Sequence, residues 1–182
     1  NTVGVTVGVN GRTVVHSDSG GVTIAFPDVC KTPSPAGPIP IPYPNVAKSS
    51  DTADGSSSVK MDGNPIMLKT SNFSTSTGDE AGTAGGGVVS NTTKGKAEFI
   101  NFSFDVKVEG KNVPRQLDLM IHNKMSAPNT PPTPLIQPPL IPVQIVTCPC
   151  CSKSHKPSEW RSKSDTGDTT KDLEKLKCSI GA

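Results

Sequence analysis

The chain has 182 residues, of which 32% are hydrophobic and only 4% aromatic, and it contains 17 glycines and 18 prolines. This composition excludes a large packed core, so we expect stability to come from backbone pairing, proline rigidity, a metal ion or a partner protein. The formal net charge of +2 argues against nucleic acid as the main ligand, because phosphate binding needs a concentrated basic surface. The sequence has no apolar stretch long enough to span a bilayer, so we expect no stable membrane insertion.

Short strands are predicted at the beginning of the chain. Valine alternates with glycine or threonine over residues 3–9, a pattern typical of a β-strand with one β-branched face. Asn10-Gly11 favours a tight hairpin turn, and residues 13–16 can form the returning strand. A third short strand is expected over residues 22–26, directly before a proline-rich segment.

The proline-rich segment spans residues 27–45, with prolines at positions 33, 35, 38, 40, 42 and 44. Each proline fixes φ, removes a backbone donor and pushes the preceding residue into extended geometry, so the segment can be neither a helix nor a central strand. We expect a stiff part of the fold that carries Cys30 at its beginning and Tyr43 near its end. The alternative is a polyproline linker or a docking ligand for a small domain with an aromatic groove.

Two further hairpins are predicted in the middle of the chain. Residues 59–68 form one of them, with Asp-Gly as its turn. Residues 97–108 read as a strand that contains three of the five phenylalanines, and the turn at 109–112 returns the chain along residues 113–123. Together with the first hairpin, the sequence therefore predicts three hairpin-like units.

A second proline-rich run marks a change of composition. We interpret residues 129–147 as a proline-rich linker that separates the main β domain, residues 1–128, from a segment with Cys and His at residues 148–182. Within that last segment, a threonine cap and the leucine spacing predict a short helix over residues 169–178.

Three histidines are present, and two of them end separate strand-like segments. His16 and His122 hold these positions, and Cys30 follows a third segment. Because imidazole nitrogen and thiolate sulfur are the usual donors to structural zinc, the three side chains are candidates for one site at a common apex. The alternative is a pair of surface histidines and an inert buried cysteine.

Four of the five cysteines lie in the C-terminal segment. Cys148, Cys151, His155 and Cys178 form a second candidate zinc set, with Cys150 as a substitute ligand. Adjacent cysteines are poorly suited to a disulfide framework and well suited to thiolate metal binding in a reducing compartment, so we expect folding in the cytosol. Free or oxidised thiols are the alternative.

Cys30 and His122 also permit a catalytic interpretation. In a cysteine-dependent hydrolase the thiol would act as nucleophile and the imidazole as its base. Such an enzyme needs a third group that orients the imidazole and a pocket that stabilises the oxyanion, and no motif in the sequence marks either of them.

Several motifs follow one another in a fixed order along residues 1–128. In chain order they are Val15-His16 with Ser19-Gly20-Gly21, Pro27-Asp28-Val29-Cys30-Lys31-Thr32-Pro33, Pro40-Ile41-Pro42-Tyr43-Pro44-Asn45, Thr77-Gly78-Asp79-Glu80-Ala81-Gly82, Gly95-Lys96-Ala97-Glu98-Phe99, Phe104-Asp105-Val106-Lys107-Val108-Glu109-Gly110-Lys111-Asn112-Val113 and Leu117-Asp118-Leu119-Met120-Ile121-His122-Asn123. This series resembles the PAAR-like domain associated with type VI secretion effectors. Several long motifs in a shared order are far more specific than any single spacing.

The resemblance implies a mainly β protein with a small cone-shaped fold. Short hairpins with pseudo-threefold character and long proline-rich loops would form the cone, and the C-terminal segment with its cysteines would follow it. The base would sit on a trimeric VgrG-type spike, with one copy per trimer. In related PAAR proteins a zinc ion is bound near the apex by histidines and a cysteine, which implies His16, Cys30 and His122 here without an evident fourth ligand.

The function implied is that of a non-enzymatic spike tip that sharpens the spike for membrane puncture and links effector cargo to it. The protein would be assembled in the bacterial cytoplasm and then secreted or injected into a target cell. Residues 148–182 would be the start of a toxin passenger, an adaptor for an effector or chaperone, or a chain end with its own zinc. The alternatives are the Cys30/His122 hydrolase and a structural β domain unrelated to secretion.

Overall fold

The computed structural model describes residues 5–139, 146–147 and 154–155. The chain forms two units, Asn1–Ile141 and Pro142–Ala182, called here the N-terminal and the C-terminal unit. In the C-terminal unit, β15 (Val146–Thr147) pairs antiparallel with β16 (Ser154–His155). The predicted helix at 169–178 lies outside the described residues, as do four members of the second zinc set, Cys148, Cys150, Cys151 and Cys178.

The fold is mainly β, as predicted, and the one helical element among the described residues is the single turn η1 (Ser49–Asp51). Three short antiparallel hairpins confirm the three units expected from the sequence. They are β1 (Gly8–Val9) with β2 (Arg12–Thr13), β6 (Lys60–Met61) with β7 (Asn64–Pro65), and β11 (Lys107–Val108) with β12 (Lys111–Asn112).

Each hairpin turns through two residues that both have positive φ. Such turns match the twist of the flanking strands and favour Asn-Gly or Asp-Gly, because these residues tolerate the left-handed region. The φ values are 51° and 74° at Asn10 and Gly11, 51° and 80° at Asp62 and Gly63, and 51° and 75° at Glu109 and Gly110. In the third turn Glu109 adopts the same positive φ, although glutamate is not among the residues that favour this region.

The same polar cap follows each hairpin, eight residues after the glycine of its turn (11 to 19, 63 to 71 and 110 to 118). The side chain of the capping residue accepts a hydrogen bond from the backbone N–H three residues earlier. The backbone N–H of the capping residue donates to the carbonyl of that earlier residue. The side-chain bonds are His16 N to Ser19 Oγ at 3.3 Å, Leu68 N to Ser71 Oγ at 2.8 Å, and Arg115 N to Asp118 Oδ2 at 2.7 Å. The chain therefore contains a threefold internal repeat.

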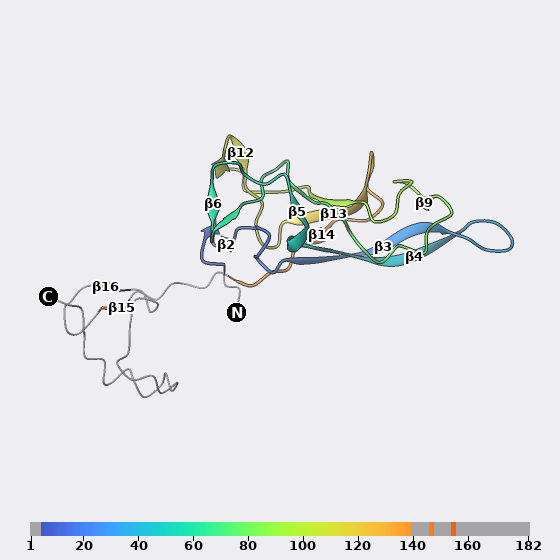
Figure 1. Ribbon diagram of the computed structural model, residues 1–182, viewed down its shortest axis with the longest axis horizontal. Coiled ribbons are helices and arrows are strands. Elements are labelled where there is room, and N and C mark those ends of the chain that lie inside the picture. Colours follow the sequence, from blue (N-terminus) through green and yellow to red (C-terminus); the bar gives the residue numbers. More distant parts are fainter. Residues whose placement is uncertain (1–4, 140–145, 148–153, 156–182) are drawn as a thin grey trace, which may run out of the picture. The chain divides into compact units, whose positions relative to one another are not determined.

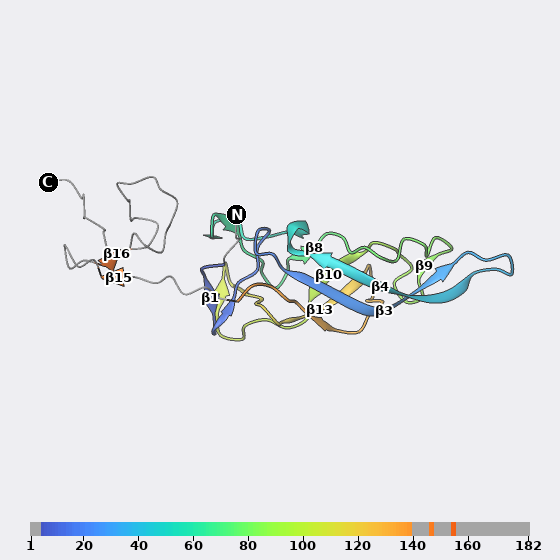
Figure 2. The ribbon, with the colours of Figure 1, turned by 90° about the horizontal axis from the view of Figure 1, so that it is seen from below.

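The three repeats join in a ring. The Gln116 N–H donates to the Thr13 carbonyl at 2.9 Å, and at the equivalent positions the Lys69 N–H donates to the Asn112 carbonyl at 2.8 Å. An isolated bridge between His16 and Ile66 connects the first two repeats. The ring encloses a buried apolar cluster of Val5, Val9, Val14, Ile66, Leu68 and Val113. In Figures 1 and 2 the three hairpins lie at one end of the N-terminal unit, and the turn of the long hairpin β3–β4 lies at the other.

The long hairpin consists of β3 (Val22–Thr32) and β4 (Ile39–Lys48), paired antiparallel. A strand was expected only as far as residue 26, but β3 continues through Pro27 because the register shifts between Ala25 and Asp28 and the proline lies in that irregularity. On its other side β3 pairs with β9 (Gly86–Gly87). This places Cys30 in a central strand, between two neighbours.

The second part of the proline-rich segment lies in β4 and forms the edge of this sheet. In the order β4-β3-β9, β4 has one neighbour, and it carries Pro40, Pro42 and Pro44. A proline has no N–H to donate, so its presence prevents another strand from pairing regularly along the free edge. The expectation that this segment is part of the fold is confirmed, but the exclusion of a central strand was wrong for residues 27–32, which belong to β3 and lie between β4 and β9.

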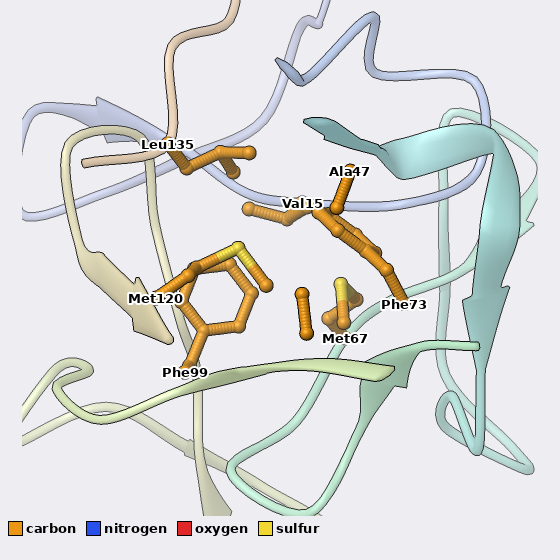
Figure 3. Packing of buried hydrophobic residues seen from close by; sticks show 8 residues of the cluster. Val15, Ala47, Met67, Phe73, Phe99, Met120 and Leu135 are labelled. Atoms are coloured by element: carbon orange, nitrogen blue, oxygen red, sulfur yellow. The ribbon is translucent and has the colours of Figure 1, made fainter. Parts of the chain in front are cut away.

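A second, five-stranded sheet has the order β14-β13-β10-β8-β5. Its strands are β14 (Thr133–Pro134), β13 (Leu119–Lys124), β10 (Lys96–Phe99), β8 (Asn72–Phe73) and β5 (Thr52–Ala53). The predicted strand at 97–108 is therefore shorter than expected, and Phe104 beyond it is 86% exposed. The buried residues in Figure 3 form the core against this sheet. There the rings of Phe73 and Phe99 pack edge to face, with their centroids 6.1 Å apart.

The structure differs from the linker expected at residues 129–147. The first part of that range belongs to the N-terminal unit, because β14 pairs with β13 and Leu135 is fully buried in the core. Ile136 exchanges two backbone hydrogen bonds with Val22, at 2.7 and 2.8 Å. Prolines are compatible with this path because β14 is an edge strand.

Candidate functional site

A buried polar group lies on the inner side of the long hairpin. Asp28 and Cys30 are two residues apart on β3, so both side chains point to its buried face, and Asp79 comes from the loop after β8. All three side chains are buried, and their potential ligand atoms lie within 4.8 Å of one another. These three residues are called the Asp–Cys–Asp group below.

The sulfur of Cys30 lies between the two carboxylates. Its Sγ is 3.6 Å from Asp28 Oδ1 and 3.9 Å from Asp79 Oδ2. Two amide groups also approach the sulfur, with Nδ2 of Asn123 at 3.8 Å and Nδ2 of Asn129 at 3.9 Å. The sulfur is thus surrounded by polar atoms, although no part of the cysteine is exposed to solvent.

Three asparagines hold the carboxylate of Asp28. Asn45 from β4 donates its Nδ2 to Oδ2, and Asn129 donates its Nδ2 to Oδ1 and to the Val29 carbonyl, the latter at 2.8 Å. Asn123 from β13 donates to Oδ1 at 3.3 Å. The carboxylate therefore connects β3, β4, β13 and the segment before β14.

Asp79 is held by the backbone and by close packing of its loop. The Lys94 N–H donates to both of its carboxylate oxygens, at 3.0 and 3.2 Å. A Cβ added to Gly82, in the same loop, would lie 2.5 Å from Cβ of Cys30, and a Cβ added to Gly78 would lie 2.0 Å from the Pro44 carbonyl oxygen. The loop reaches the sulfur because it has no side chain at these two positions.

Burial dominates the electrostatics of the group. It raises the pKa of the Cys30 thiol to about 12, and the negative charges of Asp28 and Asp79 add to the shift. Burial also raises the pKa of Asp79 to about 6, against the lowering effect of the Lys94 N–H. Within residues 5–139, neither carboxylate lies within 4.0 Å of a lysine, arginine or histidine nitrogen. Among these residues, therefore, no lysine, arginine or histidine forms an ion pair with the group.

The structure does not bring His16, Cys30 and His122 together as zinc ligands. The group whose ligand atoms converge within the described residues contains Cys30 with two carboxylates and neither histidine. His16 is buried in the hairpin ring, where its Nε2 lies 3.4 Å from Asp62 Oδ2. Strand ends were expected to meet at one apex, but His16 belongs to the hairpin repeat while Cys30 continues within a long strand.

His122 lies on β13 and is fully buried. Its Nε2 is 3.1 Å from Oγ1 of Thr23, and burial lowers its pKa to about 4, although the charge of Asp28 acts in the opposite direction. The polar neighbours of the Cys30 sulfur are the carboxylates and amides named above and do not include this imidazole. A thiol with a pKa of about 12 is protonated at neutral pH. Together with the absence of the imidazole from the neighbours of the sulfur, this argues against a Cys30/His122 nucleophile.

Comparison with known proteins identifies the family. The sequence pattern of the Toxin PAAR-like domain matches residues 21–129. The chain belongs to this family. The match contains the long hairpin, the Asp–Cys–Asp group and two of the three hairpin repeats, so the PAAR-like resemblance is confirmed. No solved structure matches the chain.

A curated relative is the DNase toxin Tse7 of Pseudomonas aeruginosa, which is 46% identical over 119 residues. The alignment covers 62% of this chain and 31% of the relative, so the chain spans about a third of the relative's length. The expectation of a protein without enzymatic activity is contradicted by this finding, because the relative that shares the PAAR-like sequence is named as an enzyme. The expectation came from the resemblance to a spike-tip domain, which carries no information on an attached activity.

Sequence reasoning found Cys30 and missed the residues around it. These residues are Asp28, Asn45, Asp79, Asn123 and Asn129. The first four lie inside the motifs that carry the PAAR-like resemblance, so the motifs themselves contained the signal. Among the described residues, no helix combines the length and apolar character needed to cross a membrane.

Proposed function

We propose that the N-terminal unit is the tip of a type VI secretion spike and caps a trimeric VgrG-type protein. The observation that carries this proposal is the ring of three hairpin repeats, with matching turns, matching caps and equivalent hydrogen bonds between repeats. Membership of the Toxin PAAR-like domain family supports the same assignment.

A threefold repeat within one chain suits a trimeric partner. A symmetric trimer presents three equal surfaces around its axis, and a single chain can contact all three in the same way only if it repeats its own surface three times. The hairpin ring supplies such a surface at one end of the N-terminal unit (Figures 1 and 2). The stoichiometry that follows is one chain per trimer.

The opposite end of the unit is built for stiffness. There the proline-bearing edge strand β4 and the central strand β3 form a long hairpin, and prolines restrict the conformations that an unfolded chain can reach. A tip that is driven through a membrane must resist local unfolding. We therefore assign the hairpin ring to the spike and the β3–β4 turn to the leading end.

The cargo proposed is a nuclease activity linked to the same polypeptide. The support is the relative named a DNase toxin, which shares the PAAR-like sequence over about a third of its length. The spike would deliver this activity from the bacterial cytoplasm into a target cell. The tip acts mechanically, and the attached activity acts on nucleic acid after delivery.

Binding to a purified trimeric spike protein tests the proposal. We expect native mass spectrometry to show one copy per trimer. Phe104 lies beside the β11–β12 hairpin, where its carbonyl accepts from Asn112 Nδ2 at 3.4 Å, and its side chain is 86% exposed. F104D should weaken binding at least tenfold, and the matched control I39D, at the 42% exposed Ile39 near the opposite end, should bind like the wild type.

Two results would contradict the proposal. Three copies per trimer would show that the internal repeat does not match the symmetry of the spike. Absence of binding to any spike trimer of the host would favour a structural β domain unrelated to secretion. In a bacterial competition assay, F104D should also prevent DNA loss in recipient cells, while I39D should not.

A further inference from the structure

We infer that Asp28, Cys30 and Asp79 hold a divalent transition-metal ion, with the amide oxygen of Asn45 as the fourth donor. Zn²⁺ is the ion that this donor set fits best. The inference concerns the stability of the long hairpin and does not depend on binding to a spike.

The first argument is charge. Two carboxylates and a thiol lie together in the interior, and within residues 5–139 no cationic side chain lies within 4.0 Å of either carboxylate. Buried charges in proteins are paired or coordinate metal ions, because an isolated buried anion is costly. A divalent cation neutralises most of the charge, whereas the single proton of the thiol can bond to only one of the two carboxylates.

The second argument is distance. With a Zn–S bond of about 2.3 Å, a Zn–O bond of about 2.1 Å and a tetrahedral angle, sulfur and oxygen ligands lie about 3.6 Å apart. The sulfur of Cys30 is 3.6 Å from an oxygen of Asp28 and 3.9 Å from an oxygen of Asp79. The side chains thus already have nearly the spacing of ligands around one ion.

The third argument is an unused donor. Asn45 is fully buried, and its Nδ2 donates to Asp28, which holds the amide head against the Asp–Cys–Asp group. Its Oδ1 has no hydrogen-bond partner in the part of the chain that the structure describes. A buried amide oxygen without a partner is costly, and a metal ion would accept its lone pair.

The surroundings resemble the outer shell of a metal site. Asn123 and Asn129 donate to Asp28 and lie 3.8 and 3.9 Å from the sulfur, so they would orient the ligands without binding the ion themselves. Asp79 accepts from a backbone N–H and keeps lone pairs for a ligand bond. Because thiolate selects borderline and soft ions, the set favours Zn²⁺ over Ca²⁺ or Mg²⁺.

The test uses the full chain with Cys148, Cys150, Cys151 and Cys178 changed to serine, so that Cys30 is its only thiol. After purification without chelators, elemental analysis should find close to one equivalent of zinc. Replacement by Co²⁺ should produce a thiolate-to-cobalt charge-transfer band in the near ultraviolet. In this background D79N should weaken Zn²⁺ binding at least tenfold and remove most of the cobalt band, and N45A should weaken binding less.

His16 and Asp62, which do not belong to the Asp–Cys–Asp group, provide the matched controls. H16Q and D62N change the pair of imidazole and carboxylate in the hairpin ring, and both variants should keep the metal and the cobalt band. Absence of metal from the purified protein together with no cobalt band would overturn the inference. Loss of metal in H16Q but not in D79N would assign the ion to another site and would also overturn it.

Discussion

Substitution of Leu135 tests most directly whether the proline-rich stretch after residue 129 belongs to the folded domain. L135A removes about three carbon groups from a fully buried side chain, which corresponds to about 2.4 kcal/mol of transfer free energy at about 0.8 kcal/mol for each group. A residual cavity adds to this loss, so we expect the free energy of unfolding to fall by about 3 kcal/mol, within the range known for such substitutions.

The adjacent residue supplies the control. Ile136 is 57% exposed, and I136A should change the free energy of unfolding by less than about 1 kcal/mol. Urea unfolding followed by far-ultraviolet circular dichroism measures both variants, and the slope with urea should stay unchanged. Equal, small effects of L135A and I136A would show that residues 130–139 form a linker, and would refute the argument from burial.

Three further outcomes are expected. The backbone N–H and hydroxyl of Ser58 and the backbone N–H of Ser57 donate to the Glu109 carboxylate and lower its pKa to about 2. The stabilisation that this carboxylate gives to the folded state is therefore complete above the ordinary pKa of glutamate and is lost as the pH falls through about 2. E109Q should therefore lower the melting temperature at neutral pH, and a gap from the wild type that did not close below pH 4 would contradict this assignment. G82A should destabilise the protein by about 1–3 kcal/mol, because the new Cβ would lie 2.5 Å from Cβ of Cys30, and a neutral result in urea unfolding would mean that the loop moves freely. Cys30, tested as the only thiol, should resist iodoacetamide in the native protein and react fully in urea, whereas rapid native labelling would show that the site is open.

Local chemistry made several elements predictable. Asn10-Gly11 and Asp62-Gly63 adopt the positive φ values that a two-residue hairpin turn requires, and the prolines of β4 lie on a sheet edge, where a missing N–H has little cost. The third turn was expected with less typical residues, and it has the same backbone geometry. These features depend on a few neighbouring residues, so one sequence is enough to predict them.

The equivalence of the three hairpins needed the structure. The caps at Ser19, Ser71 and Asp118 use different side chains, so their shared role is visible only from the matching hydrogen bonds. The path of the chain after residue 129 could also be determined only from the structure, because a proline-rich run has the same composition in a linker and in an edge strand. Burial of Leu135 decides between the two.

At the candidate site, too, the sequence predicted one residue and only the structure showed its partners. The sequence pointed to Cys30 as a ligand and offered histidines as its companions, because imidazole and thiolate are the commonest zinc donors. Asp28 looked like an ordinary polar residue before a cysteine, and Asp79 lies 49 residues after Cys30. The zinc sets with His16 and His122 and with the C-terminal cysteines remain predictions from sequence alone, and the geometry favours the carboxylates.

By itself the sequence determined the mainly β class, the three hairpin turns, the stiff proline-bearing segment and membership of the Toxin PAAR-like domain family. Only the tertiary structure decided which polar side chains meet around Cys30 and where the folded unit ends. The physical reason is the range of the forces involved. Turn and proline preferences act within a few residues, whereas the Asp–Cys–Asp group depends on strand register and on a glycine-lined loop that closes over the sulfur.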